Sequence, residues 1–187
     1  MHRTFIAVDL PETIRTQLAC VRRQIDDECG DIHWVSEDKL HITVGFLGDV
    51  TSEVLSAVCE AMARTAEVMY PLEFSLPAVG LFPLGKTPRM LWAAVDDYRS
   101  DLLSLHEAAY VELKRFGFSP EHRTYRPHVT LGRIKRVWNG PRLAKRMAHM
   151  VVPPSEAITA ETLGVYTSEL RPTGARYTEV AKIPLGG

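Results

Sequence analysis

The segment HITVGFL at residues 41–47 has a counterpart in HVTLGRI at residues 128–134, and the rest of the chain can be interpreted from this repeat. Both segments read histidine, apolar, threonine, apolar, glycine, any residue, apolar. The bare His-x-Thr spacing also occurs at residues 2–4 and 122–124, but there no glycine stands two residues after the threonine. Because the two full copies begin about half a chain length apart, they predict two structurally similar halves.

Each copy has the alternation of a half-buried β-strand, in which residues i, i+2 and i+4 point to one face. We therefore expect the polar positions of both strands to line a cleft, while the apolar positions enter the core. The expected cleft residues are His41, Thr43 and Gly45 in the first strand, and His128, Thr130 and Gly132 in the second. Since glycine has no side chain, we expect the third position to leave room for a ligand.

The remaining chain alternates amphipathic helices with short apolar strands, and some strands follow one another directly. Helices are expected at residues 11–28, 51–69, 101–116 and 139–150, and strands at 4–10, 33–35, 41–47, 72–79, 89–95, 128–134, 157–168 and 176–183. We expect the Gly- and Pro-rich residues 80–88 to form a loop. This order favours an α+β fold with mostly antiparallel sheets over a doubly wound parallel sheet.

Composition limits the kind of partner. Of the 187 residues, 45% are hydrophobic and 24% are charged, as in an ordinary globular protein, and the net charge is −1. A protein that wraps long nucleic acid is usually strongly basic. The near-neutral charge argues against that role, but it allows the binding of a single phosphate or one RNA end.

The cysteines and the apolar runs bear on the cellular compartment. We expect Cys20, Cys29 and Cys59 to be free thiols, because their number is odd and their spacing does not suit a metal. No apolar run approaches the roughly 20 residues that span a bilayer, and the N-terminal apolar stretch is too short for a signal peptide. We therefore expect a cytoplasmic protein without membrane association.

Two histidines that face one cleft suit the hydrolysis of a phosphodiester. The attacking and leaving oxygens lie on opposite sides of phosphorus, so one side needs a base and the other an acid. Histidine serves both roles near neutral pH. The hydroxyls of Thr43 and Thr130 can donate hydrogen bonds to the non-bridging oxygens, where charge accumulates. A zinc site is disfavoured because no Cys, Asp or Glu at ligand spacing completes a tetrahedral set.

The chain resembles the 2H phosphoesterase superfamily, and more closely the bacterial and archaeal RNA 2′,3′-cyclic phosphodiesterases, also called 2′-5′ RNA ligases. The resemblance rests on RTFIAVDLP at residues 3–11, LHITVGFLG at 40–48, PRMLW at 88–92 and YRPHVTLGR at 125–133. These segments occur in the family's order and are spread over most of the chain. One departure is Gly45, where the family often has lysine, so a phosphate contact from that position is lost here.

The resemblance implies a fold, a reaction and roles for the motif residues. The fold would be a single bilobal domain over residues 1–187, with two pseudo-symmetric lobes, each an antiparallel sheet backed by helices, around a central cleft. The reaction would be metal-independent and cofactor-free hydrolysis of a terminal 2′,3′-cyclic phosphate to a 2′-phosphate. His41 would be the proton donor and His128 the proton acceptor. The same site could join RNA ends through a 2′-5′ bond in the reverse direction.

Residues outside the two histidine–threonine pairs are assigned less directly. Arg126 and Arg133 flank the second motif and are candidate phosphate-binding residues, as part of a basic stretch over residues 121–136. Strand alternation points Arg133 away from His128, unless the strand twists or ends there. Phe46 and Trp92 are expected in the core, although base stacking by Trp92 stays open. His33, His106 and His149 are expected to be surface or structural residues.

The sequence is compatible with several functions. The chain could be a module that binds a nucleotide or RNA end without turnover, a 2′-5′ RNA ligase, or a hydrolase of another cyclic phosphate. The expected partners are RNA ends or small nucleotides that carry a 2′,3′-cyclic phosphate. We expect a monomer.

Overall fold

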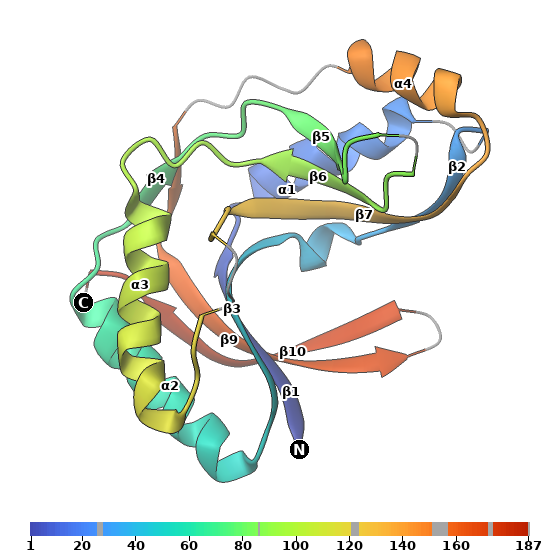
Figure 1. Cartoon of the computed structure of the whole chain (residues 1–187). Helices are drawn as coiled ribbons and strands as arrows, with labels where there is room; N and C mark the ends of the chain where they lie inside the picture. Colours follow the sequence, from blue (N-terminus) through green and yellow to red (C-terminus); the bar gives the residue numbers. More distant parts are fainter. Residues whose placement is uncertain (26–27, 86, 121–123, 151–156, 172–173, 187) are drawn as a thin grey trace.

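The computed structural model describes residues 1–25, 28–85, 87–120, 124–150, 157–171 and 174–186 (Figure 1). Its strands are β1 (His2–Asp9), β2 (Gly30–Trp34), β3 (His41–Val50), β4 (Leu72–Phe74), β5 (Val79–Phe82), β6 (Met90–Ala94), β7 (His128–Val137), β8 (Ile158–Ala160), β9 (Thr162–Arg171) and β10 (Gly174–Pro184). Its helices are α1 (Glu12–Ala19), α2 (Ser52–Glu67), α3 (Asp101–Leu113) and α4 (Gly140–Ala148), with short 3-10 turns at Cys20–Gln24, Glu37–Lys39 and Lys114–Phe116.

One large antiparallel sheet organises the molecule. Its strand order is β10-β9-β1-β3-β7-β6-β5, and β2 pairs with β7 beside this path. The strands β4 and β8 form a second, two-stranded sheet. The α+β class with antiparallel sheets is therefore confirmed.

The two motif strands lie at the middle of the large sheet, and their pairing is minimal. Within the described residues, β3 and β7 pair at one position, where Ile42 faces Val129. Both side chains are fully buried. The β3 strand is otherwise paired with β1, and β7 with β6 and β2. The sheet thus consists of two halves that are joined where the two histidine-containing strands begin.

Helices α2 and α3 pack against each other and against the half of the sheet that contains β3 (Figure 1). The α2 helix begins after Thr51, whose hydroxyl accepts a hydrogen bond from the Val54 N–H and so caps the helix. Its buried face includes Leu55, Val58 and Met62, at the three- and four-residue spacing of an amphipathic helix.

The predicted elements differ from the structure in four places. The strand expected at residues 157–168 is divided into β8 and β9, which belong to different sheets. Residues 80–88 were expected as a loop, but Val79–Phe82 forms β5 and pairs with β6. The expected strand at residues 72–79 ends at Phe74 and pairs with β8. The expected helix at residues 11–28 is α-helical only to Ala19 and then tightens into a 3-10 turn.

Cys20, Cys29 and Cys59 form no disulfide among the described residues, as expected. In the described parts of the chain, no helix is both long enough and apolar enough to cross a membrane.

The Ile42–Val129 pair is expected to hold the two halves of the sheet together. Replacement of Ile42 by Ala leaves a cavity at this crossing and should lower the free energy of unfolding by about 2–5 kcal/mol, measured by urea denaturation. The matched control is Val68→Ala, because Val68 is 73% exposed; it should change stability by at most about 0.5 kcal/mol. Equal effects of the two substitutions would contradict the structural role of the crossing.

Candidate active site

The crossing of β3 and β7 gathers four polar side chains on one face of the sheet. Directly opposed residues of an antiparallel pair point to the same face, and their neighbours point to the other face. Since Ile42 and Val129 face the core, the residues on either side of them face away from it. The four residues are His41, Thr43, His128 and Thr130, which we call the His–Thr quartet.

Both imidazoles are oriented by the backbone in the same way. The Nδ1 of His41 lies 2.7 Å from the carbonyl oxygen of Lys39, and the Nδ1 of His128 lies 2.9 Å from that of Arg126. A carbonyl oxygen only accepts, so Nδ1 carries the proton in each neutral ring. Each ring therefore presents Nε2 for proton transfer. The Nε2 of His41 is 3.1 Å from the Thr43 hydroxyl.

The electrostatic surroundings of the two histidines differ. Burial lowers the pKa of His41, while the Lys39 carbonyl and the Asp9 carboxylate oppose this effect and the charge of His128 adds to it. Asp9 is the residue opposite His41 in the β1–β3 pairing. Ala94 takes the corresponding position opposite His128 in the β6–β7 pairing. The two halves are thus similar in backbone but unequal in charge.

Register shifts in both motif strands change which residues face the quartet. Val44 has no partner between the pairs Ala7–Thr43 and Ile6–Gly45, and an unpaired residue of this kind reverses strand alternation. As a result Phe46 turns away from the core and is 59% exposed. The expectation that Phe46 is a core residue is therefore wrong.

The same irregularity in β7 resolves the position of Arg133. Leu131 has no partner between the pairs Trp92–Thr130 and Leu91–Gly132. Arg133 then pairs with Met90, which shares a face with Trp92 and hence with Thr130. The strand irregularity places Arg133 on the quartet side, where it is exposed.

Two residues outside the motifs hold the irregular part of β3. The Nδ1 of His106 donates to the Val44 carbonyl at 2.8 Å, and the Tyr125 hydroxyl donates to the Thr43 carbonyl at 3.1 Å. The two rings stack with centroids 4.1 Å apart and an interplanar angle of 7°. A strand irregularity disrupts the regular ladder, so its carbonyls need other donors. His106 was expected to be a surface or structural residue, and its contacts give it a structural role; no local signal in the sequence indicated its partner.

The motif glycines are closely packed by neighbouring side chains, although Gly45 also lines a hollow together with Thr43 and His128. A Cβ on Gly45 would lie 3.0 Å from the Tyr110 hydroxyl, and one on Gly132 would lie 3.0 Å from the Ile32 side chain. Neighbouring side chains therefore already fill both positions.

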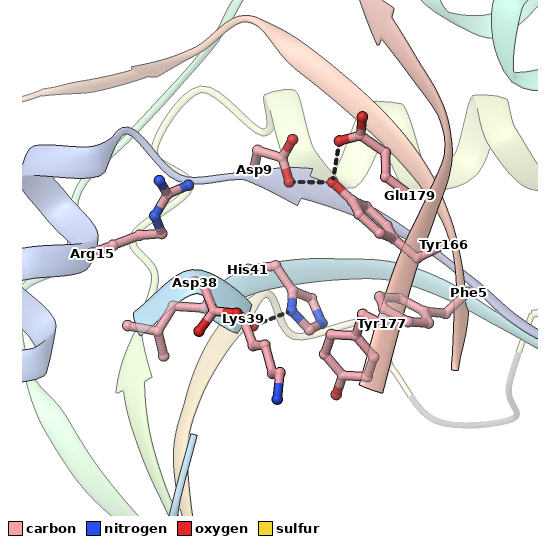
Figure 2. A pocket seen from close by; sticks show the side chains of 10 residues that line it. Phe5, Asp9, Arg15, Asp38, Lys39, His41, Tyr166, Tyr177 and Glu179 are labelled. Carbon is pink, nitrogen blue, oxygen red and sulfur yellow. Dashed lines mark hydrogen bonds between the residues drawn. The ribbon is translucent and has the colours of Figure 1, made fainter. Parts of the chain in front are cut away.

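Two hollows adjoin the quartet on either side. The aromatic hollow, of about 350 Å³, is lined by Thr43, Phe46, Phe82, Trp92, Tyr125 and His128, among others. The charged hollow, of about 180 Å³, is lined by Asp9, Arg15, Lys39, His41, Tyr177 and Glu179, among others (Figure 2). His41 and His128 were expected to line one cleft, but they line different hollows. The two hollows adjoin at Thr43, which lines the aromatic hollow and whose hydroxyl lies 3.1 Å from the Nε2 of His41 in the charged hollow.

The other predicted site residues are placed as follows. Arg126 lines the aromatic hollow with His128. Thr130 donates to the sulfur of Met90 at 3.6 Å. Trp92, expected in the core, lines the aromatic hollow and meets the His128 ring edge-on, with centroids 5.9 Å apart. The basic stretch over residues 121–136 lies partly outside the described residues, because 121–123 are not among them.

In the portion of the chain that is described, no group of three or more His, Cys, Asp and Glu side chains is arranged to hold a metal ion. Independence from metals stays a prediction for the reaction itself.

The fold and the two histidine–threonine strands define a phosphoesterase of the two-histidine class. The chain belongs to the LigT-like phosphoesterase family, whose model matches residues 8–92 and 94–177. Each matched part contains one motif. The resemblance inferred from the sequence is therefore confirmed.

Individual relatives agree with this family. The chain is 31% identical over 175 residues to a Thermotoga maritima protein named RNA 2′,3′-cyclic phosphodiesterase, covering 94% of this chain and 91% of that one. It superposes on the TT0787 protein of Thermus thermophilus with a TM-score of 0.82 at 27% identity, covering 99% and 98% of the two chains. The fold is also that of LigT from E. coli, solved with 3′-AMP, with a TM-score of 0.74 at 23% identity over 100% and 99% of the chains.

The lowered pKa of His41 should be visible in the pH dependence of stability. The unfolded chain takes up a proton near pH 6.5, where folded His41 is still neutral, so this residue lowers the free energy of unfolding as pH falls below that value. Compared with His41→Asn, which can keep the bond to Lys39, the wild type should lose more stability from pH 6.5 downward. The difference should stay below about 1.4 kcal/mol per pH unit, the limit for one proton. Parallel stability curves for the two proteins, from urea titrations, would contradict the assignment.

Proposed function

We propose that this protein hydrolyses the terminal 2′,3′-cyclic phosphate of RNA ends or small nucleotides to a 2′-phosphate, without a metal ion or a cofactor. The observation that supports this most is the His–Thr quartet, in which two imidazoles with the same backbone tether flank a single crossing of two strands. The names of the relatives support the substrate class. Binding alone needs no such pair of proton-transfer groups.

The quartet supplies the parts of an in-line displacement. One Nε2 takes a proton from water as the oxygen attacks phosphorus, and the other gives a proton to O3′ as the P–O3′ bond breaks. The hydroxyls of Thr43 and Thr130 donate to non-bridging oxygens. The bond from Nδ1 to a carbonyl keeps each ring in the tautomer that the reaction needs and stabilises the ring when it is protonated.

We assign the proton donor to His41 and the acceptor to His128. Burial favours neutral His41 in the free protein. The donor role therefore requires an opposing charge, which the Asp9 carboxylate and the bound anionic phosphate provide. Arg126 and Arg133, on the quartet side, are proposed to bind the phosphate and draw the RNA end toward it. A cytoplasmic location, a monomeric state and a single bilobal domain remain predictions.

The central test is hydrolysis of an oligonucleotide that ends in a 2′,3′-cyclic phosphate, in excess EDTA. The wild type should form the 2′-phosphate with a bell-shaped dependence of kcat/KM on pH. His41→Ala and His128→Ala should each lose about 100-fold or more of the activity, because each removes a general acid or base. His149→Ala is the control, since His149 is exposed at the end of α4 and should keep wild-type activity. Full inhibition by EDTA would contradict the metal-free mechanism.

The donor and acceptor roles can be separated with a leaving group that needs no proton. In a substrate whose O3′ is replaced by sulfur, the thiolate leaves without general acid catalysis. The loss of activity caused by His41→Ala, relative to the wild type, should therefore be at least about 10-fold smaller on this analogue than on the oxygen substrate. His128→Ala should be equally impaired on both. If the sulfur analogue restores activity to His128→Ala and not to His41→Ala, the donor and acceptor roles are the reverse of those proposed.

A further inference from the structure

An aromatic side chain stands edge-on to each motif imidazole. Tyr177 of β10 meets His41 with ring centroids 5.6 Å apart and an interplanar angle of 79°. Trp92 of β6 meets His128 at 5.9 Å and 88°. The two aromatic residues therefore have similar packing roles, one in each half of the molecule. They differ in where their polar atoms lie.

The polar atom of Trp92 lies close to Gly80 of β5. Its Nε1 is buried and has no hydrogen-bond partner among the described residues. A Cβ on Gly80, the cross-strand neighbour in β5, would lie 3.2 Å from this nitrogen. Trp92 thus contributes only its ring to the site.

The hydroxyl of Tyr177 is placed differently. Its neighbour Tyr166 donates to the Asp9 carboxylate at 2.5 Å and lies 3.4 Å from the Glu179 carboxylate, so its hydroxyl is engaged within the protein. The hydroxyl of Tyr177 points away from that group (Figure 2) and has no hydrogen bond within the described residues. The ring is held by Phe5 at a centroid distance of 4.9 Å and by His41. A fixed ring therefore holds a free donor at the edge of the quartet.

The charge next to Tyr177 indicates what this donor binds. Burial raises the pKa of Tyr177, which keeps its hydroxyl protonated, while the nearby positive charge of Arg133 acts in the opposite direction. Tyr177 thus packs against His41 and lies within the electrostatic influence of Arg133, whose side chain the strand irregularity of β7 turns to the quartet side. A neutral donor beside a cation is suited to an anionic oxygen.

We propose that Tyr177 is a substrate-binding residue whose hydroxyl donates a hydrogen bond to a non-bridging phosphate oxygen, on the His41 side of the quartet and next to Arg133. The inference rests on the proposed function, because it assumes that the phosphate lies at the quartet. It assigns a direct part in the reaction to a residue of β10, a strand that contains neither motif.

The decisive variant is Tyr177→Phe, because it keeps the ring contacts with His41 and Phe5 and removes only the hydroxyl. Loss of a hydrogen bond to a charged oxygen should lower kcat/KM for the cyclic-phosphate substrate by about 10-fold or more. The affinity for inorganic phosphate, measured by calorimetry, should fall by a similar factor. The pH profile should keep its shape, since the proton-transfer groups are unchanged.

The matched control is Tyr70→Phe, which removes a hydroxyl from a side chain that is 80% exposed and outside both hollows; it should behave like the wild type. If Tyr177→Phe keeps wild-type kcat/KM and phosphate affinity, the hydroxyl has no role and the inference is wrong. If the wild type itself fails to hydrolyse the substrate, the proposed function fails instead. A purely structural role would lower the melting temperature of Tyr177→Phe without changing its phosphate affinity, and this result would also overturn the inference.

Discussion

The site depends on one backbone pairing, between Ile42 of β3 and Val129 of β7. Each strand is held along most of its length by other neighbours, so in the described parts of the chain the two halves of the sheet pair only where the motif strands begin. Because the paired side chains are fully buried, the residues beside them must face the other way. Residues from two distant parts of the chain are thereby gathered around one point, and the fold needs no further device to bring the two histidines near each other.

Two strand irregularities then extend the site beyond the motifs. The unpaired residues Val44 and Leu131 reverse the alternation in each strand, and the residue five positions after each histidine turns to the quartet side. In one half this residue is Phe46 and in the other it is Arg133. The irregularity in β3 frees carbonyls that His106 and Tyr125 bind, so residues outside the repeat stabilise the conformation that the repeat needs.

The sequence alone predicted the features that depend on the local residue pattern. It did not predict the features that depend on how strands pair with one another. The repeat identified the quartet residues, since alternation holds over the first three positions of each strand. After Thr43 and Thr130, alternation no longer predicts which face a side chain takes, because a residue left unpaired depends on the register of two strands together. For this reason Phe46 was wrongly expected in the core. Likewise β5 formed from a stretch rich in glycine because β6 offers it a partner. Tyr177 lies far from both motifs in sequence, and only the packing of β10 shows that it meets His41.

The near-symmetry of the backbone makes the asymmetry of the side chains informative. A symmetric pair of imidazoles would have equal proton affinities, and nothing would decide which one gives and which one takes a proton. Here Asp9 faces His41 where Ala94 faces His128, and burial lowers the pKa of His41. Burial weakens the hold of His41 on its proton, and a carboxylate and a bound phosphate strengthen it. In the proposed function, a proton that His41 holds firmly only while the phosphate is bound would be suited to transfer to the leaving oxygen, which is the role of a general acid.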